Sequence, residues 1–228
     1  MPYTSTINVS VLNCPENEDL RGFCPEAGSP LDPKPFYAPL GSSVWTSSGQ
    51  LSQRNITAIA QAASGGMKSG PGFEPTRASV AASVENSLAL AAGHGYSKLA
   101  IPFIGGGIFY GRILPKISLA ELAEVIVNAA ENGCGIVQPV IVAFASSDVA
   151  HFKNAIAKLG ATKVTVVQGS IMDHDLHGCN AIVNAANMEV MFGGGISGKI
   201  AHATQDQAGI DAEALTEVKA FWAANPAS

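Results

Sequence analysis

Two glycine-rich segments of this sequence have the residue types of an anion-binding site. Residues 104–109 read IGGGIF, and residues 192–196 read FGGGI. Because glycine has no Cβ, its backbone can approach a ligand oxygen closely, and successive N–H groups can form an anion-binding nest. Two such loops suit a diphosphate, whose two phosphoryl groups need donors from both sides. Close packing of a helix on a strand would explain one glycine run well, but it explains two less well.

The charge of the chain favours an anion site made of backbone amides. The net charge is −5, with only 13 Lys and Arg residues. Binding to nucleic acid relies on clustered cations that release counterions, so we do not expect nucleic acid as a partner. If the ligand is anionic, main-chain N–H groups must hold it.

Other phosphate and metal motifs match less well. Residues 193–199 have the G-x-x-x-x-G-K spacing of a P-loop, but Ile200 stands where a magnesium-binding hydroxyl is needed. Neither loop has the G-x-G-x-x-G dinucleotide spacing. His174 and His177, even with Cys179 nearby, lack a third ligand at a recognisable spacing. We therefore expect no metal and no cofactor, interpret both histidines as loop residues, and keep an ATP-binding P-loop-like module as an outside alternative.

The elements around the two loops are those of an α/β domain. Apolar runs predict strands at residues 43–46, 55–62, 98–104, 139–145, 163–167 and 180–184. Helical patterns cover residues 76–92, 118–132, 148–159 and 211–224, and a further helix begins in the second glycine loop. The alternation predicts a three-layer α/β/α sandwich with a mixed, mostly parallel central sheet, whose ligand binds beyond the carboxyl ends of the strands.

Composition and the start of the chain complete the expected organisation. A length of 228 residues, 47% of them hydrophobic, suits one generous domain. Residues 1–40, with six prolines after a short strand at 7–12, are expected to form an appendage of unassigned role. Scattered cysteines, the lack of a signal segment and the lack of a long apolar run lead us to expect an intracellular protein, cytoplasmic or nuclear, outside the membrane.

Residues 164–204 carry a specific family resemblance. They read VTVVQGSIMDHDLHGCNAIVNAANMEVMFGGGISGKIAHAT, which resembles the opening half of a macrodomain, the ADP-ribose-binding family. Macrodomains carry a strand, a G-D-I turn, a strand ending in N-A-A-N, a G-G-G loop and a helix. The matching residues here are Gly169-Ser170-Ile171, Asn184-Ala185-Ala186-Asn187 and the glycines at 193–195.

The second half of a macrodomain resembles residues that come earlier in this chain. Residues 98–111, KLAIPFIGGGIFYG, are similar to the strand with the second phosphate loop, and residues 140–156 to the last strand and helix. Residues 41–63 are similar to the mid-domain strands. This order implies a circularly permuted macrodomain over residues 41–228, which closely placed termini permit. A cut across two tandem macrodomains is the alternative.

The resemblance implies a role for each matched residue. One phosphate would accept hydrogen bonds from Gly193, Gly194, Gly195 and Ile196, and the other from Gly105, Gly106, Gly107, Ile108 and Phe109. Asn187 would hydrogen-bond the distal ribose and would be the catalytic residue of a hydrolase. Ser170, Ile171 and Asn184 lie in the matched ligand-binding motifs. Phe144 would stack on adenine, unless it is an ordinary core phenylalanine.

Two departures from the family pattern leave the activity open. Ser170 replaces an Asp that accepts from the adenine amino group, so we expect weaker or less adenine-selective binding by about 1 to 2 kcal/mol. Ser197 replaces an Asp that helps activate water in many hydrolytic members. The expected ligand is ADP-ribose or a mono-ADP-ribosylated protein side chain. The sequence permits both hydrolysis of an ADP-ribosyl ester and non-catalytic reading.

Overall fold

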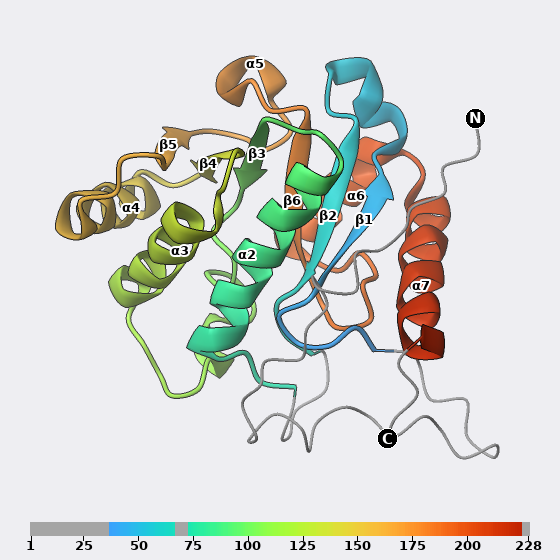
Figure 1. Ribbon diagram of the computed structural model, residues 1–228, viewed down its shortest axis with the longest axis horizontal. Helices are drawn as coiled ribbons and strands as arrows, with labels where there is room; N and C mark the ends of the chain where they lie inside the picture. The colour runs from blue at the N-terminus through green and yellow to red at the C-terminus, as the bar shows by residue number, and fades with distance from the viewer. Residues whose placement is uncertain (1–36, 67–72, 225–228) are drawn as a thin grey trace.

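The computed structural model describes residues 37–66 and 73–224 (Figure 1). The expected strand at residues 7–12 and most of the expected appendage lie outside the described residues. Tyr37 and Ala38 precede the expected domain boundary at residue 41, yet both are buried, and the Ala38 N–H donates to the Met188 carbonyl at 2.7 Å. These residues therefore belong to the packed body.

Six strands form one mixed sheet. They are β1 (Ser43–Ser47), β2 (Ala58–Ala63), β3 (Lys98–Ile101), β4 (Gln138–Ala143), β5 (Thr165–Gln168) and β6 (Ala181–Ala186). Their order across the sheet is β1-β2-β6-β3-β4-β5. Only β1 and β2 pair antiparallel, and every other neighbouring pair is parallel. The prediction of an α/β fold with a mixed, mostly parallel sheet is confirmed.

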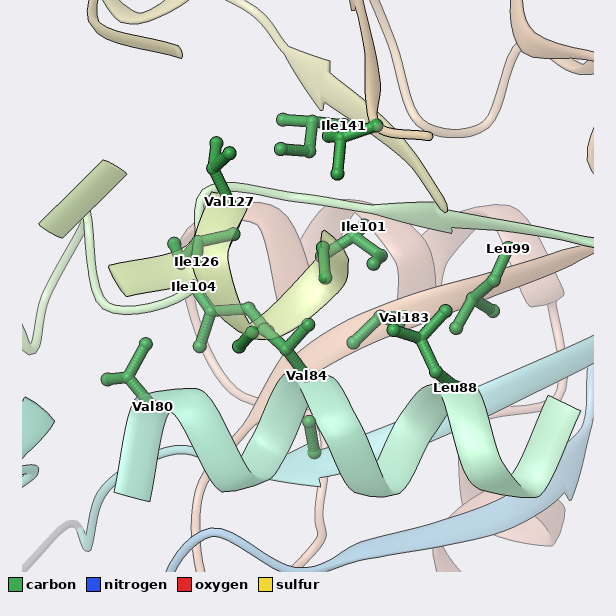
Figure 2. Packing of buried hydrophobic residues seen from close by; sticks show 14 of the residues in the cluster. Val80, Val84, Leu88, Leu99, Ile101, Ile104, Ile126, Val127, Ile141 and Val183 are labelled. Carbon is green, nitrogen blue, oxygen red and sulfur yellow. The ribbon is translucent and has the colours of Figure 1, made fainter. Parts of the chain in front are cut away.

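One face of the sheet packs on α2 (Arg77–Gly93), α3 (Leu119–Gly133) and α4 (Ser146–Leu159). The helix predicted at residues 76–92 is confirmed as α2, and its Val80, Val84, Leu88 and Ala91 are all fully buried. Figure 2 shows the first three projecting from α2 toward residues of the strands and of α3. This is the larger apolar core, and it holds the ends of the central strands in place.

The opposite face packs on the 3₁₀ helix η2 (Gly49–Arg54), α6 (Gly195–Thr204) and α7 (Gln207–Ala224). In Figure 1, α2 and α3 lie in front of the sheet, α6 lies behind β6, and α7 runs beside β1. Two further short elements are η3 (Tyr110–Arg112) and α5 (His174–His177). Helices therefore cover both faces, as a three-layer fold requires.

Several predicted boundaries are wrong by a few residues. Residues 102–104 belong to a loop, because β3 ends at Ile101, and β2 begins at Ala58 rather than at residue 55. Ala145 is the N-cap of α4, rather than a residue at 147 or 148, and α7 begins at Gln207. Ser118, in contrast, caps α3 through a capping box with Glu121, as a Ser three residues before a Glu indicates.

The expectation that the protein lies outside the membrane can be compared with the length and hydropathy of its helices. None of the helices in residues 37–66 and 73–224 is long and apolar enough to span a membrane.

Candidate functional site

The two glycine loops meet at one edge of the sheet. They follow β3 and β6, which are adjacent and parallel, with Ala100 opposite Ile182. Carboxyl ends of parallel neighbours lie at the same edge, so the loops leave the sheet side by side (Figure 1). A Cβ placed on Gly194 would lie 3.5 Å from Cδ1 of Ile108, which shows that the loops touch.

Between the loops lies a cavity of about 150 Å³, here called the glycine-loop cavity. Nearly every residue that lines it comes from the two loops or from the end of β6. The lining residues are Phe103, Gly105, Gly107, Ile108, Phe109, Ala185, Asn187, Gly193, Gly194, Gly195, Ile196 and Ser197. Sequence reasoning did not assign Phe103 and Ala185 to the site, although Phe103 directly precedes the IGGGIF segment and Ala185 lies inside the N-A-A-N motif.

The N-terminus of α6 supplies unused donors to this cavity. An α-helix leaves its first N–H groups without intrahelical acceptors. The N–H groups of Gly195 and Ile196 are in this position, and no acceptor among the described residues contacts them or the N–H of Gly194. The positive end of the helix macrodipole adds to their attraction for an anion.

The glycines of the loop after β3 have different roles, because one shapes the turn and another borders the cavity. Gly105 is buried with φ +77°, and an added Cβ would lie 3.3 Å from Cδ1 of Ile113, so it forms the turn. An added Cβ on Gly107 would meet no atom within 4 Å. The N–H groups of Gly107, Ile108 and Phe109 have no backbone acceptor in the described chain. These residues form the open half of the loop.

Two of the expected phosphate donors are already engaged inside the protein. The Gly106 N–H donates to the Phe103 carbonyl at 3.0 Å, closing a tight turn. The Gly193 N–H donates to Oγ of Ser197 at 3.0 Å. In this structure each of these N–H groups therefore fixes the shape of its own loop, and the expected hydrogen bonds from Gly106 and Gly193 to a phosphate stay predictions.

Ser197 has a structural role that its sequence position did not reveal. Its buried Oγ accepts the Gly193 N–H and also a hydrogen bond from Nδ2 of Asn184 at 3.1 Å. The same Nδ2 donates to Oε1 of Gln61 at 2.7 Å. Asn184 is fully buried and is not among the residues that line the cavity, so its amide supports the loop, and its expected ligand contact stays a prediction.

Asn187 is a nearly buried polar residue that lines the cavity. It follows β6 directly, is 8% exposed, and lines the glycine-loop cavity. Its buried Oδ1 has no hydrogen-bond partner among the residues that the structure describes. Since buried polar atoms are nearly always paired, this oxygen is suited to accept a hydrogen bond from a ligand hydroxyl.

Phe144 is not a core residue. Its side chain is 74% exposed at the end of β4, and Nζ of Lys199 lies 5.4 Å from the centre of its ring. Lys199 belongs to α6, so the ring stands beside the helix that begins in the second glycine loop. An exposed aromatic face at this edge can stack on a planar ligand group.

Ser170 and Ile171 lie outside the glycine-loop cavity. Ile171 is buried, and Oγ of Ser170 accepts the N–H of Met172 at 3.2 Å. Met172 lines a neighbouring hollow of about 510 Å³, and Gly195 lines both this hollow and the glycine-loop cavity. The Ser170 turn thus lies close in sequence to a hollow that shares Gly195 with the glycine-loop cavity and that is also lined by Lys199.

The two histidines after the Ser170 turn make hydrogen bonds within the protein. Contrary to the loop prediction, His174 and His177 lie in the short helix α5. Nδ1 of His177 accepts the Cys179 N–H at 3.1 Å, so the neutral ring donates from Nε2 to the Ile171 carbonyl at 3.0 Å. No three His, Cys, Asp or Glu side chains come together as a metal site in the described part of the chain.

Comparison with known proteins adds no relative. The chain matches no protein-family model, and it matches no curated protein.

Removing the Ser197 hydroxyl should destabilise the protein. Ser197→Ala leaves the Gly193 N–H without its acceptor and takes one acceptor from the buried Asn184 amide. We expect the free energy of unfolding to fall by about 1 to 3 kcal/mol. Urea denaturation measures this change, with Ser147→Ala, at an exposed position, as the matched control. Equal losses in the two variants would show that the hydroxyl does not support the loop.

His177 should make stability fall in acid. Burial lowers the pKa of His177 below its ordinary value of 6.5, so the unfolded chain takes up this proton first. The contribution of the neutral ring is complete above pH 6.5 and is lost as the pH falls toward the folded-state pKa. Urea unfolding at about pH 8 and about pH 5 should show a larger loss for the wild type than for His177→Asn, which does not titrate. Parallel losses would exclude this residue as the cause.

Proposed function

We propose that this chain binds ADP-ribose, free or attached to a protein side chain, as a circularly permuted macrodomain. The observation that carries the proposal is the opening of unpaired N–H groups from two adjacent loops into one cavity. The donors are those of Gly194, Gly195 and Ile196 on one side and of Gly107, Ile108 and Phe109 on the other. A diphosphate between the loops would receive hydrogen bonds from both.

The size of the cavity supports a ligand that is only partly enclosed. Pockets that enclose a whole drug-sized ligand have about 300 to 1,000 Å³. The glycine-loop cavity, at about 150 Å³, has room for the diphosphate portion, and the adjoining hollow of about 510 Å³ offers space for more of the ligand. Oδ1 of Asn187 is available to a ribose hydroxyl, and the exposed ring of Phe144 to adenine.

The ends of the packed body support permutation over two half-domains. Nε1 of Trp222, near the end of α7, donates to the Tyr37 carbonyl at 2.8 Å, so the last helix lies beside the start of the described chain. A permuted domain is expected to have its present ends close together, because they arise where one connection of the ancestral chain was opened. Both glycine loops also belong to one sheet and to one site, whereas two half-domains would each lack a neighbour for their own loop.

The composition of the cavity favours reading over hydrolysis. None of its described lining residues is Asp, Glu, His, Cys or Lys, so no general acid or base stands at the site. Hydrolysis would have to rely on Asn187 and on an oxygen of the ligand itself. P-loop-like ATP binding is less favoured, because Lys199 lines the adjoining hollow rather than the glycine-loop cavity.

Valine at Gly107 or at Gly194 should abolish tight binding without disturbing the fold. An added Cβ meets nothing within 4 Å at Gly107 and only Ile108, at 3.5 Å, at Gly194, so each side chain would occupy ligand space. Losing two charge-assisted hydrogen bonds corresponds to roughly 100-fold in affinity. Calorimetry with ADP-ribose, AMP and Mg-ATP measures the effect, and Gly111→Val, exposed and free of neighbours within 4 Å, is the control. Unchanged affinity in both cavity variants would mean that the loops serve packing alone.

Asn187→Ala separates reading from hydrolysis. Loss of one hydrogen bond to Oδ1 should weaken ADP-ribose binding by about three- to tenfold. If the protein binds the modification without hydrolysing it, the wild type retains a glutamate-linked ADP-ribosyl peptide and releases no ADP-ribose. Mass spectrometry of the peptide would show this. Release by the wild type that disappears in Asn187→Ala, with binding largely kept, would instead identify a hydrolase.

A further inference from the structure

The hollow of about 510 Å³ that adjoins the glycine-loop cavity runs along one face of α6. Gly195, Gly198, Lys199 and His202 line it, at the three- and four-residue spacing that places residues on one side of a helix. Arg54, at the end of η2, lines it from the neighbouring element, since η2 packs against α6. We call this space the basic hollow. From Gly195 to His202 it follows the helix for about 10 Å.

The ionisable side chains that line the basic hollow are all bases. They are Arg54, Lys199 and His202, and no Asp or Glu is among the described residues of its wall. Asp173 and Asp206 stand next to lining residues in the sequence, but they do not line the hollow. In a chain with net charge −5, this is a local concentration of positive charge. It attracts an anion rather than a cation.

The two permanent charges of the basic hollow are not neutralised by the protein. No ion pair between described residues involves Arg54 or Lys199. Nζ of Lys199 instead lies 5.4 Å from the centre of the Phe144 ring. A guanidinium group can donate two parallel hydrogen bonds to one phosphate, and an imidazole N–H such as that of His202 is a further donor. These groups together suit a phosphate.

Two glycines connect the basic hollow with the glycine-loop cavity. Gly195 lines both spaces, and its N–H is one of the unpaired donors at the start of α6. A Cβ on Gly198 would lie 2.7 Å from the carbonyl oxygen of Gly193, so a larger residue does not fit there. The first turn of α6 therefore has no side chain on the face toward the hollow. A ligand held by the N–H groups of this turn can extend along that face.

Phe144 indicates which end of the proposed ligand lies toward the basic hollow. Its exposed ring is the surface suggested for adenine, and Lys199 contacts this ring while it also lines the hollow. Asn187, suggested for the distal ribose, lines the glycine-loop cavity but not the hollow. The adenosine half of the ligand would therefore be the half beside the basic side chains.

We propose that the basic hollow binds a phosphate group carried by the adenosine ribose of the ligand, in addition to the diphosphate at the glycine loops. This inference rests on the proposed function. ADP-ribose itself has only hydroxyl groups on that ribose, which would leave the charges of Arg54 and Lys199 without a partner. The phosphate has two possible sources. One is a monoester at the 2′ oxygen, and the other is the diphosphate of a further ADP-ribose unit attached there.

Three ligands test the proposal and identify the source of the phosphate. Calorimetry on the full chain compares ADP-ribose with 2′-phospho-ADP-ribose and with a linear dimer of ADP-ribose. We expect at least one of the two larger ligands to bind about tenfold more tightly than ADP-ribose. Tighter binding of the monoester identifies a 2′-phosphate site, and tighter binding of the dimer alone identifies a polymer site. The gain should shrink between about 0.05 M and about 0.5 M NaCl, because salt screens exposed charges.

Variants of the basic side chains complete the test. Arg54→Gln should remove most of the gain from the added phosphate and leave the affinity for ADP-ribose unchanged, while Arg54→Lys should keep part of the gain. Lys163→Gln is the matched control. It removes the same charge from an exposed side chain just before β5, at the sheet edge opposite the glycine loops, and should keep the full gain.

Three results would overturn the proposal while leaving the proposed function intact. They are binding of ADP-ribose with no gain from the added phosphate, a gain that survives in Arg54→Gln, and an equal loss of the gain in Lys163→Gln. Failure of the wild type to bind any of the three ligands would instead contradict the proposed function, and this inference with it.

Discussion

The parallel pairing of β3 with β6 is the constraint on which the candidate site depends. These strands are far apart in the chain, yet they are neighbours in the middle of the sheet, and both run toward the same edge. Any other place for β6 would separate the two glycine loops and leave each with donors for at most one phosphoryl group. The apolar cores on both faces keep this pairing in register, because shifting one strand would move its buried side chains out of them.

A buried polar chain fixes the second loop to the sheet. It runs from Thr46 on β1 through Gln61 on β2 and Asn184 on β6 to Ser197 and the Gly193 N–H. Hydrogen bonds in a medium of low dielectric constant hold their geometry firmly, and breaking one leaves a costly unpaired group. These hydrogen-bonded polar residues thus position the second glycine loop, while the remaining N–H groups of the loop stay available to a ligand.

Anion binding at the glycine-loop cavity, as proposed, needs no cationic side chain. In a chain with net charge −5, it would rely on backbone dipoles and on the positive end of α6. The net charge of the chain would then have less influence on this proposed site than the N–H groups beside the cavity.

Local pattern was enough to identify the parts of this protein. The stripe of α2, the cap of α3, the central strands and both glycine loops follow from spacing and residue type, which act over a few neighbouring residues. Contacts between distant segments decided the rest. The inward direction of Asn184, whose amide bonds Gln61 on the neighbouring strand, and the exposure of Phe144 depend on how the sheet orders its strands. Periodicity along a sequence carries no such information, because it does not specify which strands become neighbours in the sheet.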